Sequence, residues 1–273
     1  MTTTPLSDST PAEPTGWREA NRANWDERVP VHVAGPFYDV PGFVAGRDTL
    51  LDFEPAEVGE VDGRTLLHLQ CHIGLDTLSW ARRGALVTGL DFSAPAVEVA
   101  RQLAVDIGRP EAEFVTADLY DAVTALGGRT FDTVYTGRGS LCWLPDIDRW
   151  ARTVAALVRP GGFLYLAEFH PVADLPGEDG RTVEGDYFQR GPIVVDEPGG
   201  YAAETSTRSS NLRYQWTHGV GQVVSALVKA GLRLEFLHEH DGGHFRLEPG
   251  QGVPLVYTVR ATKPTEPASE TAA

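Results

Sequence analysis

The stretch that decides the fold reads Leu66-Leu67-His68-Leu69-Gln70-Cys71-His72-Ile73-Gly74-Leu75-Asp76-Thr77. The apolar run at residues 65–69 predicts a buried strand, and residues 74–83 have the apolar spacing of a helix. A second apolar run at residues 85–90 predicts the next strand, which Asp91 closes. This order, with an acid at the tip of the second strand, is the layout of the nucleoside-binding half of a doubly wound sheet. The acid would accept hydrogen bonds from ribose hydroxyls.

The turn after the first strand differs from the dinucleotide-binding fingerprint, which requires three glycines. The first two glycine positions hold Gln70 and His72, and only Gly74 remains. Side chains at these positions keep the backbone from approaching a pyrophosphate closely. The turn therefore favours a ligand with a ribose but no phosphate, and it disfavours NAD and a dehydrogenase function.

Five segments, in order, carry a resemblance to a known family: residues 66–74, Leu90-Asp91-Phe92-Ser93, Ala117-Asp118-Leu119, residues 131–135 and Arg159-Pro160-Gly161-Gly162. Over residues 64–169 the sequence resembles the class I S-adenosylmethionine-dependent methyltransferases. The resemblance implies an α/β, Rossmann-like fold with a seven-stranded, mostly parallel sheet, helices on both faces and a reversed last strand. It also implies S-adenosyl-L-methionine as the cofactor and a small molecule as the methyl acceptor.

The alternation of helices and strands continues along the chain. We expect strands at 111–117, 131–136, 163–169, 232–240 and 255–262, and helices at 94–107, 146–158 and 216–230. Ser93 caps the helix at 94–107, and Pro95 lies early in it, as helix starts prefer. These elements predict a single domain over residues 16–263, with disordered tails at 1–15 and 264–273.

Two segments lie outside the regular alternation. Residues 16–58 hold a predicted helix at 17–29 and a short one within 47–58, and are rich in aromatic side chains. This segment is either a lid over the ligands or an ordinary packing helix. Residues 171–215 form a Gly- and Pro-rich stretch that is too long for a plain connection. We interpret this stretch, with short strands at 193–195 and 201–207, as a substrate-facing insertion; the alternative is a structural flap.

The composition restricts the partners. The 273 residues include 38 acids and 23 bases, which gives a formal net charge of −15. Binding of nucleic acid needs clustered Lys and Arg, so the balance argues against it. There is no apolar signal segment and no run of 18 apolar residues, so we expect a cytoplasmic protein without a membrane partner. The sequence leaves a homodimer open.

Ligands of open α/β sheets bind beyond the carboxyl ends of the strands. This geometry and the resemblance select the cofactor-binding candidates Tyr38, Gln70, Cys71, His72, Gly74, Asp91, Phe92, Ser93, Asp118, Leu119 and Gly137. We expect Asp91 to bind the ribose and Asp118 the adenine amino group; the alternatives are a helix cap and a helix-start acid. His72 either binds the cofactor carboxylate through a charge-assisted hydrogen bond or only orients the turn.

The substrate-binding candidates are Trp25, Arg138, Trp143, Glu168 and Tyr201. Methyl transfer from an activated sulfonium mainly requires alignment, and a base is needed only when the acceptor must lose a proton. We predict His170 as this catalytic base, because it follows the fifth strand two residues after Glu168. The alternative is a structural histidine.

Two other hypotheses stay open. The cluster His238-Glu239-His240-Asp241-Gly242-Gly243-His244 has alternating histidines that could bind zinc. Because no metallohydrolase fold precedes it, we expect no metal. The chain could also bind S-adenosylmethionine without transferring its methyl group, as a scaffold or as the catalyst of a rearrangement.

Overall fold

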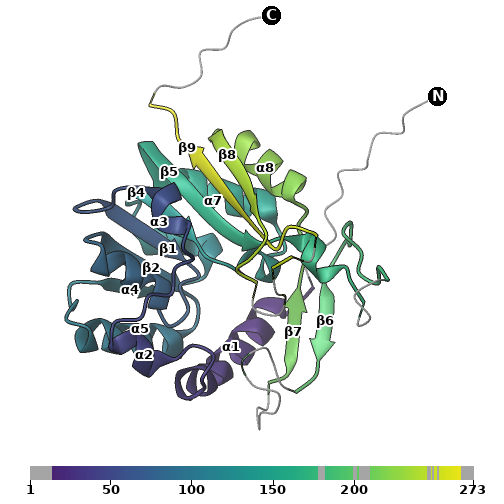
Figure 1. Cartoon of the computed structure of the whole chain (residues 1–273), viewed down its shortest axis with the longest axis horizontal. Helices are drawn as coiled ribbons and strands as arrows, with labels where there is room; N and C mark the ends of the chain where they lie inside the picture. The colour runs from purple at the N-terminus through teal and green to yellow at the C-terminus, as the bar shows by residue number, and fades with distance from the viewer. Residues whose placement is uncertain are drawn as a thin grey trace, which may run out of the picture.

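Seven strands form one sheet in the computed structural model, which describes residues 14–177, 182–198, 202, 210–244, 247, 249–250 and 252–265. The strands are β1 (Thr65–Leu69), β2 (Leu86–Asp91), β3 (Glu113–Thr116), β4 (Phe131–Thr136), β5 (Val158–Phe169), β8 (Arg233–His240) and β9 (Val256–Thr262). Their order is β3-β2-β1-β4-β5-β9-β8. β9 runs antiparallel to both β5 and β8, and the other neighbouring pairs in this sheet are parallel. The predicted fold class and the reversed last strand are confirmed (Figure 1).

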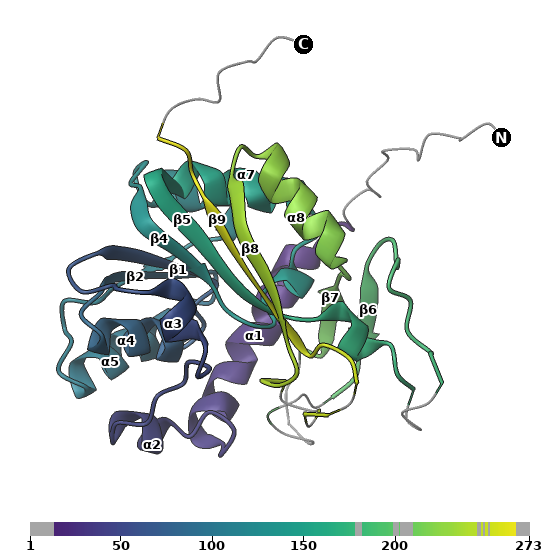
Figure 2. The ribbon, with the colours of Figure 1, turned by 45° about the horizontal axis from the view of Figure 1, so that its top comes forward.

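Helices cover both faces of the sheet (Figure 2). The longer ones are α4 (Leu75–Arg82), α5 (Ala94–Asp106), α7 (Ile147–Leu157) and α8 (Val220–Lys229). Successive side chains of a strand point to opposite faces, so Leu66 packs with the core under α4 and α5, while Leu67 packs with the core under α7 and α8. β1 is buried on both sides, as its unbroken apolar run predicts.

Local capping explains where two of these helices begin. The side chain of Ser93 accepts a hydrogen bond from the N–H of Ala96, and the side chain of Asp146 accepts one from the N–H of Arg149. β5 begins at Val158, before the predicted strand start at residue 163, and the β4–β5 register shifts between Phe131 and Thr133.

The N-terminal segment contains α1 (Trp17–Ala34), α2 (Val40–Val44) and α3 (Glu54–Val58). α1 continues past the predicted end at residue 29, with Pro30 inside the helix. No helix spans residues 47–53, so the prediction for 47–58 holds only over α3. Among the described residues, no helix combines the length and the apolar character that crossing a bilayer requires.

A second, two-stranded sheet lies in the insertion after β5. β6 (Ile193–Asp196) pairs antiparallel with β7 (Leu212–Gln215). β6 matches the prediction for 193–195, whereas the predicted strand at 201–207 falls outside the described residues except for residue 202. The predicted helix at 216–230 begins only at Val220.

α1 is attached to β7 by a reciprocal pair of hydrogen bonds. Asn21 Nδ2 donates to the carbonyl of Tyr214 at 2.9 Å, and the N–H of Tyr214 donates to Asn21 Oδ1 at 2.8 Å. Asn24 Nδ2 donates to the carbonyl of Ser210, and the N–H of Ser210 donates to Glu27. The amide of Asn21 thus makes the two backbone hydrogen bonds with Tyr214 that a neighbouring strand would make. α1 and β7 lie side by side (Figures 1 and 2). We call α1 and the β6–β7 hairpin the cover.

Gly74 offers a test of the packing at the start of α4. Its φ is 79°, and a Cβ there would lie 2.8 Å from Ala100 Cβ and 2.9 Å from Phe114 Cε1. Gly74→Ala should lower the free energy of unfolding by roughly 2–4 kcal/mol, because overpacking adds to backbone strain. Gly108→Ala is the matched control, since its φ is 71° but nothing lies within 4 Å of its Cβ position. Urea denaturation measures both, and equal losses would contradict the packing argument.

Candidate functional site

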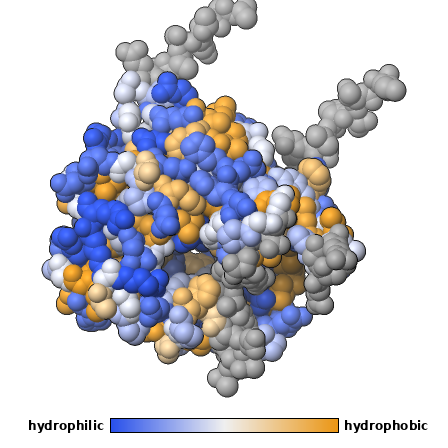
Figure 3. All heavy atoms as spheres, in the orientation of Figure 1, coloured by the Kyte–Doolittle hydropathy of each residue, from blue (hydrophilic) through white to orange (hydrophobic). Residues whose placement is uncertain are grey.

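A cavity of about 660 Å³ lies at the carboxyl ends of the parallel strands. From the strand ends it is lined by Gln70, Cys71, His72, Asp91, Phe92, Asp118, Leu119, Gly137, Arg138, Ser140 and Phe169. From the cover and its flanks it is lined by Trp17, Trp25, Arg28, Tyr38, Ile193, Arg213, Trp216 and others. The surface is hollowed near the middle of the face in Figure 3. The sheet and the cover therefore enclose one space, at the edge where α/β folds bind ligands.

The turn after β1 has a left-handed backbone at three positions. Gln70 has a φ of 57°, His72 a φ of 50° and Gly74 a φ of 79°. For a non-glycine residue this conformation costs on the order of 1–3 kcal/mol. The turn therefore keeps the backbone path of a glycine-rich loop while it carries two large polar side chains into the cavity.

Both side chains have a buried polar atom without a hydrogen-bond partner among the described residues. These atoms are Gln70 Oε1 and His72 Nδ1. The opposite end of the Gln70 amide is fixed, because Nε2 donates to the carbonyl of Ser140 at 3.0 Å. Buried polar atoms in native proteins usually have a hydrogen-bond partner. Two such atoms without a partner, on residues that line a cavity, therefore indicate a polar ligand.

Asp91 lies at the end of β2 with its carboxylate held by the backbone. Oδ2 accepts from the N–H of His72 at 2.8 Å, and Oδ1 accepts from the N–H of Ser93 at 2.9 Å. Each oxygen has a further lone pair and the residue lines the cavity. Burial raises the pKa of Asp91 to about 6, although the hydrogen bonds from Ser93 and His72 oppose this rise. The carboxylate can therefore accept hydrogen bonds from two neighbouring hydroxyls at neutral pH.

Asp118 also lines the cavity, but both of its oxygens already have partners. Oδ1 accepts from the N–H of Tyr120, and Oδ2 lies 3.1 Å from Arg18 Nε. Burial raises the pKa of Asp118 against the effect of these partners. Asp118 therefore has the location expected for an adenine contact while it also caps a helical turn, so the two alternatives for it are compatible.

His72 belongs to a cluster of rings that connects the turn with α1. Its Nε2 lies 3.0 Å from His32 Nδ1, and the ring of Tyr38 stacks on it at 5.2 Å. Burial, with a smaller effect of Arg28, lowers the pKa of His72 to about 3. A neutral imidazole can still donate to a carboxylate, whose own charge assists the bond, so the structure is compatible with both alternatives for His72. His72 offers a neutral donor or acceptor.

Trp25 and Trp143 meet over the cavity, one from α1 and one from the loop after β4. Their rings are 5.2 Å apart in an edge-to-face arrangement. The guanidinium of Arg28, which is buried, lies 5.0 Å from the ring of Trp25 and 5.7 Å from that of Trp143. Trp25 and Trp143, which were predicted to bind the substrate, therefore line the cavity, and the guanidinium of Arg28 lies beside them.

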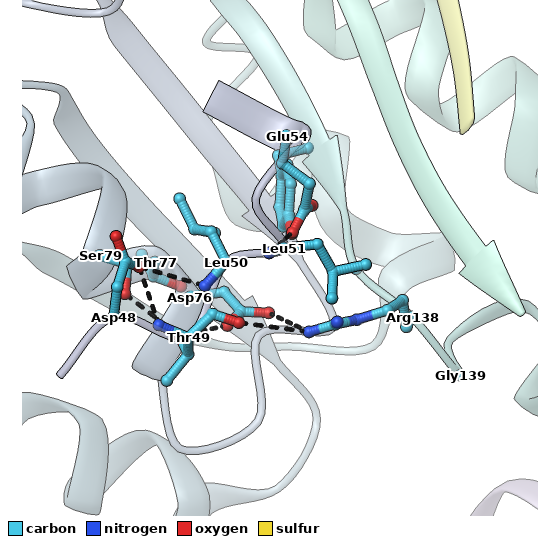
Figure 4. A network of polar contacts seen from close by, with 12 residues as sticks. Asp48, Thr49, Leu50, Leu51, Glu54, Asp76, Thr77, Ser79, Arg138 and Gly139 are labelled. Carbon is cyan, nitrogen blue, oxygen red and sulfur yellow. Dashed lines mark hydrogen bonds and ion pairs between the residues drawn. The ribbon is translucent and has the colours of Figure 1, made fainter. Parts of the chain in front are cut away.

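A polar network stands where the segment before α3 meets α4 (Figure 4). Arg138 Nη2 lies 4.0 Å from Asp76 Oδ2 and 3.4 Å from the carbonyl of Thr49. Thr49 Oγ1 donates to Asp76 Oδ1 at 2.5 Å. Burial disfavours the charge of Arg138, but the carboxylates of Asp76 and Glu54 outweigh it and raise its pKa. Arg138, Asp76 and Thr49 all line the cavity and offer it both signs of charge.

Among the described residues predicted for substrate binding or catalysis, Glu168 and His170 do not line the cavity. The carboxylate of Glu168 accepts hydrogen bonds from the N–H groups of Gly139, Ser140 and Leu141, so it holds the loop after β4 instead of a substrate. His170 Nε2 lies 3.1 Å from Glu239, and its Nδ1 accepts from the N–H of Val172. His170 is bound on the β8 side of the sheet, which favours the structural alternative.

The other candidates divide as follows. Cys71, Phe92, Leu119 and Gly137 line the cavity, and Gly74 and Ser93 act through packing and capping. Tyr201 lies outside the described residues. Arg28, Asp76 and His244, which were not among the predicted cofactor, substrate or catalytic residues, also line the cavity. The acid in the first turn of α4 was a usable signal for Asp76, whereas the location of Arg28 and His244 depends on long-range packing.

Comparisons with known proteins support a methyltransferase domain with a Rossmann-like fold. Residues 67–164 match a family model described as "Methyltransferase domain". A ubiquinone biosynthesis O-methyltransferase of Paracidovorax citrulli is 30% identical over 124 residues, which are 43% of this chain and 51% of that protein. One of Vibrio vulnificus is 32% identical over 117 residues, 43% of this chain and 48% of that protein. The chain thus spans about half the length of these curated relatives.

Solved structures extend the likeness of the fold beyond this segment. The CcbJ methyltransferase from Streptomyces caelestis has a TM-score of 0.60 at 16% identity, covering 90% of this chain and 99% of its own. An S-adenosylmethionine-dependent methyltransferase from Methanosarcina mazei has a TM-score of 0.58 at 21% identity, covering 81% and 100%. The match over residues 67–164 and the strand order support a class I S-adenosylmethionine-dependent methyltransferase, with S-adenosylmethionine as the cofactor.

Asp91 predicts a pH-dependent affinity for the demethylated cofactor. Because its folded pKa is about 6, lowering the pH from 7.5 to 5 protonates the carboxylate and removes an acceptor for ribose hydroxyls. The affinity of the wild type for S-adenosylhomocysteine should fall over this range. Asp91→Asn should bind more weakly by about 1–3 kcal/mol at pH 7.5 and show little of the fall. Calorimetry at four pH values decides, and a wild-type affinity independent of pH would contradict the role.

His170→Ala should reduce stability more than turnover. The substitution leaves Glu239 without its partner and removes the cap on the N–H of Val172. We expect a loss of about 1–2 kcal/mol in the free energy of unfolding and an affinity for S-adenosylhomocysteine within error of wild type. Urea denaturation and calorimetry measure the two quantities. A turnover loss above about 100-fold in a folded His170→Ala protein would restore it as a general base.

Proposed function

We propose that this chain transfers a methyl group from S-adenosylmethionine to O, N or C of a small molecule. The observation that carries the proposal is that one cavity joins the polar groups at the ends of β1 and β2 to the aromatic rings of the cover. Its volume of about 660 Å³ falls within the range of about 300–1,000 Å³ that is usual for small-molecule sites.

The residues at the strand ends fit the cofactor. Asp91 has lone pairs for the ribose hydroxyls, and the orphan Gln70 Oε1 can accept a hydrogen bond from an amino group. Arg138 is a half-buried cation on the cavity wall that suits a carboxylate, and Asp118 borders the same space. When bound, S-adenosylmethionine supplies an electrophilic methyl group on a sulfonium. The work left to the protein is to exclude water and align the acceptor.

The cover supports an acceptor with a flat or apolar body. Trp25, Trp143 and Phe169 line the cavity together with Leu175 and Ile193 from the insertion. The relatives in Paracidovorax citrulli and Vibrio vulnificus are named O-methyltransferases, which favours oxygen as the atom that receives the methyl group. The net charge of −15 argues against nucleic acid, and we propose action in the cytoplasm, as a monomer or a homodimer.

An acceptor that loses a proton needs a base in the cavity. Burial lowers the pKa of His68 and that of His72 to about 3, so both accept protons poorly at neutral pH. His244 is half-buried, lines the cavity, and places its ring 4.8 Å from that of Phe169 at the end of β5. We assign the general base to His244 in place of His170 for acceptors that carry an ionisable proton.

The experiment separates transfer from mere binding of the cofactor. Calorimetry with S-adenosylhomocysteine and with NAD tests the ligand, and mass spectrometry with a panel of phenols, amines and carboxylic acids tests for methylated products. We expect binding of S-adenosylhomocysteine only, and its time-dependent formation with at least one acceptor. Trp143→Ala should raise KM for that acceptor by about tenfold, in line with the loss of a buried aromatic contact, and change cofactor affinity little.

Two results would contradict the proposal. Binding of NAD without binding of S-adenosylhomocysteine would support a dehydrogenase. Binding of S-adenosylmethionine without any turnover over the whole panel would support the second candidate, a cofactor-binding scaffold or a catalyst of a rearrangement.

A further inference from the structure

Three metal-ligating side chains meet on the outer part of the sheet, away from the cavity. Glu57 comes from α3, and His238 and His240 come from β8. One ligand atom from each lies within 4.8 Å of the others. The two histidines are two residues apart on one strand, so their side chains share a face of the sheet. None of the three lines the cavity.

Aromatic rings fix the orientation of both imidazoles. The ring of Phe236 stacks on that of His238 at 4.2 Å, and the ring of Phe53 stacks on that of His240 at 3.7 Å, each with planes 5° apart. The carboxylate of Glu57 is fixed as well, because its Oε2 accepts a hydrogen bond from the hydroxyl of Tyr165 at 2.8 Å. Such outer partners orient ligands in metal sites.

We propose that Glu57, His238 and His240 bind one divalent transition-metal ion, with Zn²⁺ as the best match. Two histidines and one carboxylate are a known zinc-binding set, and a water completes the tetrahedron. Bonds of about 2.0–2.2 Å put ligand atoms about 3.4 Å apart in such a site. Glu57 Oε1 and His240 Nε2 already lie 3.5 Å apart.

The third ligand needs a small adjustment. His238 Nδ1 donates a hydrogen bond to Glu57 Oε1 at 2.7 Å. Binding of the ion requires the proton to leave Nδ1. The imidazole remains neutral by carrying its proton on Nε2 instead, so no net proton needs to be released. The distance then opens by about 0.7 Å to the spacing of the tetrahedral site. Half of the His238 side chain is exposed, which gives the ion and its water access from solvent.

The site differs from the metal hypothesis considered from the sequence alone. That hypothesis grouped His238, His240 and His244, whereas His244 lines the cavity. The third ligand comes instead from Glu57, which precedes β8 by more than 170 residues in the chain. A bound ion would tie α3 to the edge strand β8. It would thereby stabilise the segment that leads from the cover into β1.

The test uses tag-free, full-length protein treated with a chelator and then dialysed. Calorimetry with Zn²⁺ at pH 7.5 should give one ion per chain, and Co²⁺ should give the visible absorption of a tetrahedral site. Glu57→Gln and His240→Ala should each weaken binding by at least about 100-fold, more than the loss of an outer partner causes. His238→Asn should weaken binding in the same way. Because His238 is half-exposed, this variant keeps the test valid if Glu57→Gln or His240→Ala fails to fold.

Glu239→Gln is the matched control. Glu239 lies between the two histidines on β8, but its carboxylate contacts His170 on the opposite face. It should bind Zn²⁺ as tightly as the wild type, and Zn²⁺ should raise the unfolding temperature of the wild type and of this variant alone. Absence of stoichiometric binding would overturn the proposal, since the three residues then form only an ion pair. Equal binding by all variants would overturn it too, because the ion would sit elsewhere.

Discussion

The turn between β1 and α4 is the constraint on which the rest of the site depends. Its backbone is left-handed at Gln70, His72 and Gly74, and only the last of these is a glycine. The strain at the two other positions, on the order of 1–3 kcal/mol each, persists because the surrounding structure holds them. Gln70 Nε2 binds the loop after β4 through the carbonyl of Ser140, and the N–H of His72 binds Asp91.

The side chain of His72 gives this turn a role that a glycine could not have. Its ring contacts His32 and Tyr38, both of which belong to the N-terminal segment. α1 is in turn joined to β7 through Asn21. A continuous set of contacts therefore leads from the turn after β1 through α1 to the insertion after β5. The cover is held by the same residues that shape the end of the cavity at β1 and β2.

The sheet and the first turn were predictable because they depend on local signals. The apolar runs, the acid that ends β2 and the cap at Ser93 each lie within a few residues of the feature they specify. His170 shows the limit of such local signals. Alternation along β5 stops where a helical turn begins at Pro171, and His170 Nδ1 caps that turn. The direction of the side chain is therefore set by the turn and by Glu239, a residue distant in sequence.

Glu168 shows a second limit. An acid at the end of a parallel strand looks the same in sequence whether it faces a ligand or the backbone. Asp91 accepts two backbone N–H groups and still borders the cavity, whereas Glu168 accepts three from the loop at 139–141 and a fourth from Phe169. Buried carboxylates need donors, and which donors reach them depends on loop paths that no local pattern encodes.

The cavity is lined by two parts of the chain, one inside and one outside the segment that matches the methyltransferase family model. The residues at the ends of β1, β2, β3 and β4 lie within the segment 67–164 that matches the methyltransferase family. Trp25, Arg28, Phe169 and the lining residues of the insertion lie outside it. The groups at the strand ends that we propose for the cofactor thus lie inside the matched segment, whereas most of the aromatic wall proposed for the acceptor, apart from Trp143, lies outside it. The match over residues 67–164 therefore bears on the cofactor and carries little information on the acceptor.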